Sequence, residues 1–160
     1  MSKVVEKRTL QRHFNPVKAK LALMDECFSQ LRNGLPPSKD DYVEADRLTH
    51  SYVISCFLMI VQRAVDINNA IIEFSGNTPP YQKHQSFRSI QESGAIDLET
   101  LNFFEHALNC YQKIANPYEG FPAPDLYDVS SLLLQHGEAY ARQINDFFDD
   151  TNTKTVAEDS

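Results

Sequence analysis

Apolar residues recur every three or four positions along most of the chain, and this spacing places them on one face of an α-helix. The first apolar stripe covers residues 17–31. Asn33-Gly34 and Pro36-Pro37 follow it directly. Glycine is favoured just after a helix and proline cannot continue one, so the pattern predicts a helix that stops at this point.

A second stripe begins at Ser38, which together with Asp41 resembles a capping box. Helical spacing then continues without a break to about Glu73, before Ser75-Gly76. Within it, residues 53–61 are apolar on nearly every side. We therefore expect one long helix, and we expect it to be the most buried element of the fold.

Three more helices are predicted in the remainder of the chain. A short one lies near residues 85–91 and ends at Gly94. A long one starts at the capping residue Asp97 and ends before Pro117, because proline removes a helical hydrogen bond. The last one is predicted to be capped by Asp125 and to reach about residue 147.

These elements predict an all-α fold, a bundle of four to five helices with up-down packing. At 160 residues the chain has the length of one domain and can bury a sizeable core. We expect one helical domain over residues 14–150, a basic N-terminal arm at 1–13, and a disordered polar tail at 151–160.

The charge is distributed unevenly along the chain. The net charge is −7, yet residues 1–20 hold six basic side chains against one acid and carry +5, which leaves −12 on the other 140 residues. The overall charge argues against broad binding to nucleic acid. The basic arm is able to contact RNA or an acidic partner, or it is simply a solvated, frayed terminus.

The cysteines and the hydropathy indicate the compartment. Cys27, Cys56 and Cys110 are odd in number and lie in apolar helical patterns, which predicts buried thiols in a reducing cytoplasm. The longest apolar run, residues 53–61, is far shorter than the roughly 20 residues of a membrane span. No apolar segment follows the basic N-terminus, so neither a signal peptide nor a membrane location is expected.

Metal and cofactor sites are not predicted. None of the five histidines has a glutamate three residues before it, and neither His-Glu-x-x-His nor Cys-x-x-Cys occurs. Asp66, Asn68 and Asn69 interrupt the apolar second helix. Two interpretations stay open: one of these residues faces solvent while another bonds a neighbouring helix, or they line a site, with Asp66 and Asn69 as candidates.

A group of residues in the second half of the chain resembles a known family. Pro80, Phe87 and Ile90 are followed by Gly94-Ala95-Ile96-Asp97 at the spacing found in HepT-like proteins of the HEPN superfamily. Residues 62–72 also look like the second helix of that family. The resemblance covers about residues 14–148. It implies a homodimer with its active site in the dimer cleft, and a metal-independent endoribonuclease toxin encoded with a small nucleotidyltransferase antitoxin.

The family signature reads Arg-Asn, three residues, His, one residue, Tyr. Counting from Gly94 without a gap places Tyr111 at the arginine, Gln112 at the asparagine and Asn116 at the histidine, and only Tyr118 matches. A carboxamide does not take up a proton at neutral pH as an imidazole does. A phenol offers one neutral donor where a guanidinium offers a charged fork. The loss of a general base alone costs ~10²–10⁴ in rate.

The resemblance and these departures together predict a HepT-like homodimer in which cleavage of RNA is weak or lost. It would keep its binding to a nucleotidyltransferase partner, and RNA would be a further ligand. One alternative is an active ribonuclease toxin that uses altered residues, supplied by Arg88 or by the partner subunit. Lys113 and His106 are poor substitutes, because helical phase points Lys113 to a different side of the helix and places His106 about 80° from Asn116. Another alternative is a non-enzymatic interaction or regulatory protein.

Tyr118 carries a separate expectation. In HepT-like proteins the motif tyrosine receives AMP from the nucleotidyltransferase, which makes Tyr118 the candidate for modification. The alternative is a structural tyrosine whose ring packs on the last helix.

Overall fold

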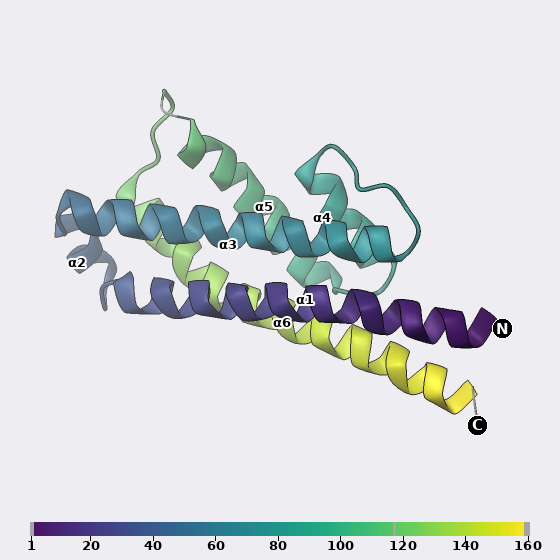
Figure 1. The fold of residues 1–160 in the computed structure, drawn as a ribbon. Helices are drawn as coiled ribbons and strands as arrows, with labels where there is room; N and C mark the ends of the chain where they lie inside the picture. Colours follow the sequence, from purple (N-terminus) through teal and green to yellow (C-terminus); the bar gives the residue numbers. More distant parts are fainter. Residues whose placement is uncertain (1, 117, 159–160) are drawn as a thin grey trace.

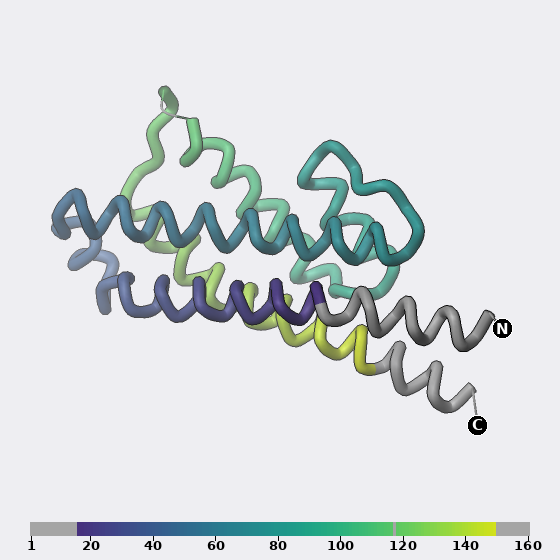
Figure 2. The backbone as a smooth tube through the Cα atoms, in the orientation of Figure 1, coloured from purple at the N-terminus to yellow at the C-terminus, as the bar shows by residue number. Residues whose placement is uncertain are grey.

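The computed structural model describes the backbone of residues 2–116 and 118–158, with side chains at 16–116 and 118–149 (Figures 1 and 2). The described residues form helices and contain no strand, so the all-α prediction is confirmed. In chain order the helices are α1 (Ser2–Gly34), α2 (Lys39–Glu44), α3 (Arg47–Phe74), α4 (Lys83–Glu92), α5 (Leu98–Ala115) and α6 (Ala123–Glu158).

The chain reverses direction between successive long helices, so the predicted up-down packing is confirmed (Figure 1). α1 and α3 lie antiparallel along most of their length, and α6 runs beside α1. α3 contacts α1, α4, α5 and α6. Eleven of its residues are buried, which confirms the expectation that this helix forms the centre of the core.

The prediction of one helix from Ser38 to Glu73 was wrong, because the structure divides this segment into α2 and α3. Ala45 has extended backbone angles (φ −64°, ψ 162°), and the Asp46 carboxylate caps α3 by accepting the Thr49 N–H at 2.8 Å. The apolar spacing runs across this break and conceals it. The described residues therefore form six helices, one more than the upper expectation.

Two predicted helix caps are confirmed and one is wrong. Ser38 accepts the N–H of Asp41, and Asp97 accepts the N–H of Thr100 at 2.8 Å. Asp125 lies inside the first turn of α6, which begins two residues earlier at Ala123. α5 ends at Ala115, and the predicted breaker Pro117 lies outside the described residues.

The predicted arm at residues 1–13 and tail at 151–160 lie entirely outside the described side chains. The bounds of α1 and α6 extend into both segments, since α1 begins at Ser2 and α6 ends at Glu158. The domain limits of 14 and 150 stay predictions.

Aromatic rings fill the junction of α4, α5 and α6. Phe87 stacks on Phe104 with ring centroids 4.7 Å apart, and the ring of Tyr140 lies 5.2 Å from that of Phe104. All three side chains are fully buried. The three cysteines are buried free thiols, as the sequence predicted.

α3 is also the helix in the described part of the chain whose length and mean hydropathy (1.3) match those of a membrane span. Core helices of bundles meet the same criteria, and α3 packs against four other helices. In this fold 39% of the apolar window is buried, and a single helix of this kind is weak evidence for a membrane span.

Candidate functional site

A cavity of about 360 Å³ opens between the start of α4 and the second half of α5. Tyr111 and Gln112, at the arginine and asparagine positions of the resembled motif, both lie in its wall. We call it the α4–α5 pocket. Seven residues line it: Tyr81, Gln82, Lys83, His84, Leu108, Tyr111 and Gln112.

The first turn of α4 gives this pocket its charge. Lys83 begins α4, and its Nζ lies 5.6 Å from the centroid of the Tyr111 ring, within cation–π distance. His84 is half-buried beside it. None of the seven lining residues is acidic, although the chain carries a net charge of −7. The lining of the pocket is therefore basic, although the protein as a whole is acidic.

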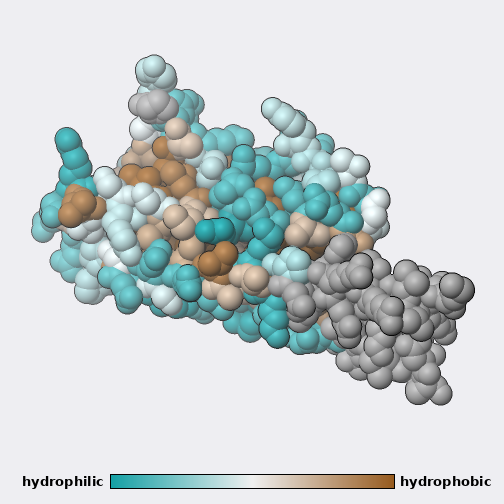
Figure 3. Space-filling view, viewed as in Figure 1, coloured by the Kyte–Doolittle hydropathy of each residue, from teal (hydrophilic) through white to brown (hydrophobic). Residues whose placement is uncertain are grey.

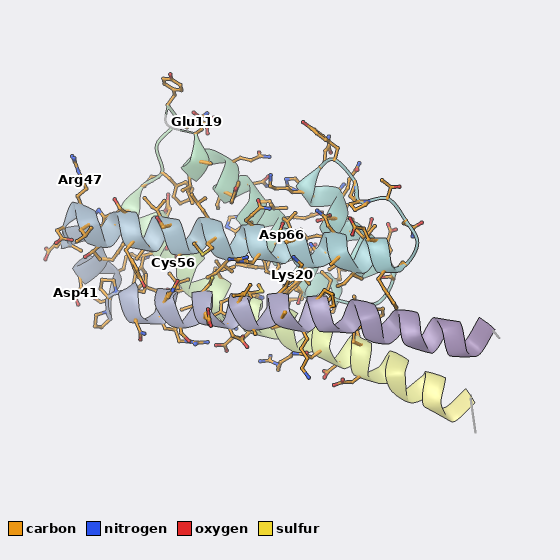
Figure 4. All side chains as sticks on the ribbon, viewed as in Figure 1. Lys20, Asp41, Arg47, Cys56, Asp66 and Glu119 are labelled. Atoms are coloured by element: carbon orange, nitrogen blue, oxygen red, sulfur yellow. The ribbon has the colours of Figure 1, made fainter. Side chains whose placement is uncertain are left out.

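The other two motif positions lie beyond the pocket. Asn116 follows the last residue of α5, and its Oδ1 accepts the backbone N–H of Tyr118 at 3.0 Å. The Tyr118 side chain is 95% exposed, so the alternative in which its ring packs on the last helix is wrong. Figure 4 shows Glu119 in the same loop, which projects past the end of α5. The four motif positions are thus split between a pocket and a loop.

A second cavity, of about 290 Å³, lies on the opposite side of α5, between this helix and α6. His106, Cys110 and Lys113 line it from α5, with His106 Nε2 3.8 Å from Cys110 Sγ. Lys113 therefore faces away from Tyr111, as its helical phase predicted. Among the described residues no three potential metal-binding side chains group together. Neither Lys113 nor His106 reaches the α4–α5 pocket.

Arg88, the remaining candidate for replacing the motif arginine, is engaged elsewhere. Its Nε donates to Glu105 Oε1 at 2.7 Å, which ties α4 to α5. It does not line the α4–α5 pocket.

The three polar residues of α3 have separate environments. Asp66 lies in a shallow groove of about 440 Å³ on the outer face of α3, where its Oδ1 accepts from Gln62 at 3.0 Å (Figure 4). Asn68 is fully buried and bonds neighbouring helices. Asn69 is half-buried, and its Oδ1 has no hydrogen-bond partner among the described residues. Neither Asp66 nor Asn69 lies in the α4–α5 pocket.

A buried chain of hydrogen bonds runs from α6 to the first turn of α4. The Tyr140 hydroxyl donates to Asn68 Oδ1 at 2.6 Å, and Asn68 Nδ2 donates to Ser86 Oγ at 3.2 Å. The Ser86 hydroxyl in turn donates to the carbonyl of Lys83 at 2.7 Å. Burial raises the pKa of Tyr140 well above its usual value, which keeps its hydroxyl protonated as a donor. These three hydrogen bonds hold in place the turn that carries Lys83 and His84.

Sequence reasoning did not identify Lys83 and His84. They precede the motif by almost thirty residues, and no spacing rule connects them with Tyr111. Only the packing of α4 on α5 brings them together. The usable signal was the absence of an acid between Pro79 and Arg88 in an otherwise acidic chain.

No family model and no curated protein matches this chain. The HepT-like resemblance therefore stays a prediction.

Proposed function

We propose that this chain is a HepT-like HEPN protein of the toxin–antitoxin type that binds RNA with weak or lost cleavage. It acts as a cytoplasmic homodimer and retains a small nucleotidyltransferase as its partner. The observation that carries the proposal is the division of the motif. Tyr111 and Gln112 line a basic pocket, whereas Asn116, at the position of the base, bonds its own loop.

This division supports binding over cleavage. Cleavage of RNA at a 2′-hydroxyl needs a group that removes its proton, and a carboxamide does not do so at neutral pH. The Oδ1 of Asn116 already accepts the N–H of Tyr118, so it is occupied as an acceptor. Lys83 and His84 still offer donors for a phosphate.

The shallow groove on the outer face of α3, in which Asp66 lies, supports self-association. Arg63 and Asp66, which carry opposite charges, both line it. In a two-fold contact through this groove, Arg63 of one copy would face Asp66 of the other. Met59, which is 43% exposed, would add apolar area. Apolar side chains interrupt the hydrophilic surface over this face of α3 (Figure 3).

A growth assay tests the proposal. Expression of the unmodified chain should slow bacterial growth little. A triple variant, Tyr111→Arg, Gln112→Asn and Asn116→His, should slow it strongly if the scaffold keeps its geometry. The matched control is His106→Gln, which changes a histidine outside the pocket. Growth arrest by the unmodified chain would contradict the loss of cleavage.

An active ribonuclease is the second candidate, because His84 lies in the same pocket as Tyr111 and Gln112. Histidine side chains take up protons near neutral pH, so His84 is a candidate base from another helix. Under this alternative the unmodified chain arrests growth, His84→Gln abolishes the arrest and His106→Gln retains it.

The partner is tested at Tyr118. Its 95% exposure makes the hydroxyl accessible to an enzyme that transfers AMP. Incubation with ATP and a nucleotidyltransferase encoded beside this chain should add the mass of one AMP. Tyr118→Phe should abolish the label and Tyr111→Phe should retain it. Labelling that persists in Tyr118→Phe would place the acceptor elsewhere.

A further inference from the structure

The α4–α5 pocket combines a basic wall with an apolar floor. Lys83 and His84 form one side, and the fully buried Leu108 lies beneath them. At the rim, Tyr81 is completely exposed. Its ring is therefore free to stack on a ligand, with the polar hydroxyl left in water. A volume of about 360 Å³ lies within the ~300–1,000 Å³ range of small-ligand sites.

These groups match the phosphate and the base of a nucleotide. An ammonium and an imidazole on one turn of helix offer donors to phosphate oxygens. An exposed phenol ring offers a stacking surface to a base, which is sequence-tolerant because every base has a π-face. The absence of carboxylates among the lining residues leaves nothing in the wall to repel the phosphate.

We propose that the α4–α5 pocket binds one nucleotide of single-stranded RNA, with its phosphate on Lys83 and His84 and its base stacked on Tyr81. The inference rests on the proposed function and names the residues that recognise the RNA. The positive charge then comes from α4 and replaces the arginine that is absent at Tyr111. A single strand fits because stacking on Tyr81 needs a base free of its duplex partner.

The pocket wall is held in place before any ligand arrives. The Lys83 carbonyl accepts the Ser86 hydroxyl at 2.7 Å, and Ser86 is joined through Asn68 to Tyr140 in the core. The Lys83 ammonium also lies over the Tyr111 ring. Pre-organised donors lose less freedom on binding than mobile surface lysines do.

The test is a binding titration with a fluorescein-labelled, single-stranded eight-nucleotide RNA, followed by anisotropy at several salt concentrations. Lys83→Gln should raise the Kd about tenfold, the value of one hydrogen bond to a charged group. It should also reduce the slope of log K against log salt by about 0.7. The matched control, Lys113→Gln, removes an equal charge from the other side of α5 and should change the Kd less than twofold.

His84 and Tyr81 are tested in the same way. His84→Gln should weaken binding while His106→Gln does not. Tyr81→Ala should raise the Kd about tenfold, and Tyr81→Phe should restore it, since stacking needs the ring and not the hydroxyl. A duplex of the same length should bind more weakly than the single strand.

The outcomes separate the two proposals. Equal losses for Lys83→Gln and Lys113→Gln, with RNA still bound by the unmodified chain, would overturn the pocket and leave the proposed function standing. No binding of RNA by the unmodified chain would overturn both. Preference for the duplex would overturn the stacked nucleotide. Circular dichroism of each variant establishes that the fold is retained.

Discussion

The two sides of the α4–α5 contact differ in almost every physical respect. On the core side, Phe87 and Phe104 stack on each other, and Asn68 is satisfied by Tyr140 and Ser86. On the outer side, the end of α5 lines the α4–α5 pocket and leads to a loop that exposes Tyr118. Packing determines the residues of the first region. Packing does not determine the exposed rings of the second region, since Tyr81 and Tyr118 are almost completely exposed.

The largest expected effect is loss of stability on the core side. Phe104→Ala should lower the free energy of unfolding by ~3–5 kcal/mol, because it removes a buried ring and leaves a cavity. Tyr118→Ala, which truncates an exposed ring, should stay within ~0.5 kcal/mol of the unmodified chain. Urea unfolding followed by circular dichroism measures both. Similar losses in the two variants would remove the distinction between the regions.

A smaller change separates hydrogen bonding from packing. Tyr140→Phe keeps the ring but leaves Asn68 Oδ1 without the hydroxyl that now donates to it at 2.6 Å. The unsatisfied buried acceptor should cost ~1–3 kcal/mol. Tyr111→Phe removes a hydroxyl from the pocket and should cost less than ~0.5 kcal/mol. A neutral Tyr140→Phe would mean that the polar chain contributes nothing to stability.

The helix α5 offers a test by pH. At its start, hydrogen bonds from Thr100 and then from Gln143 hold the pKa of Asp97 below its usual value. A carboxylate whose pKa is lower in the folded than in the unfolded state stabilises the protein at pH values above its unfolded-state pKa. This contribution disappears as the pH falls through the folded-state pKa. Asp97→Ala should therefore cost ~0.5–2 kcal/mol at pH 7, the usual value of a helix cap.

The same variant should differ little from the unmodified chain once the pH lies below the folded-state pKa of Asp97. Urea unfolding at pH 7 and at pH 3 or lower provides the comparison. A difference that persists unchanged in acid would show that the carboxylate charge is not what stabilises the start of α5.

The accuracy of the sequence prediction follows the same division. Periodicity identified the helices and the buried character of α3, because burial of one face imposes the spacing. The cap at Asp97 was predicted from its neighbours. Asp46 was missed, since a cap inside an unbroken apolar stripe changes the backbone without changing the pattern. Local signals reveal local structure and not the points where tertiary packing interrupts it.

The candidate site was predicted only in part. The resemblance identified Tyr111 and Gln112, which the structure places in one pocket, and Asn116 and Tyr118, which it places in a loop. Lys83 and His84 come from another helix, and no local pattern relates them to α5. Gly137 is a similar case: an added Cβ would lie 2.6 Å from the Phe28 ring of α1, a constraint that only the packed structure reveals.

The most direct test of the account is a single-turnover experiment with the unmodified chain in excess over a labelled single-stranded RNA, in buffer with EDTA. Anisotropy reports the fraction bound, and a denaturing gel of the same sample reports the fraction cleaved. The account predicts RNA that is bound and remains intact. Rapid cleavage would contradict the loss of catalysis that the Asn116 geometry supports, and unbound RNA would contradict the binding role of the pocket.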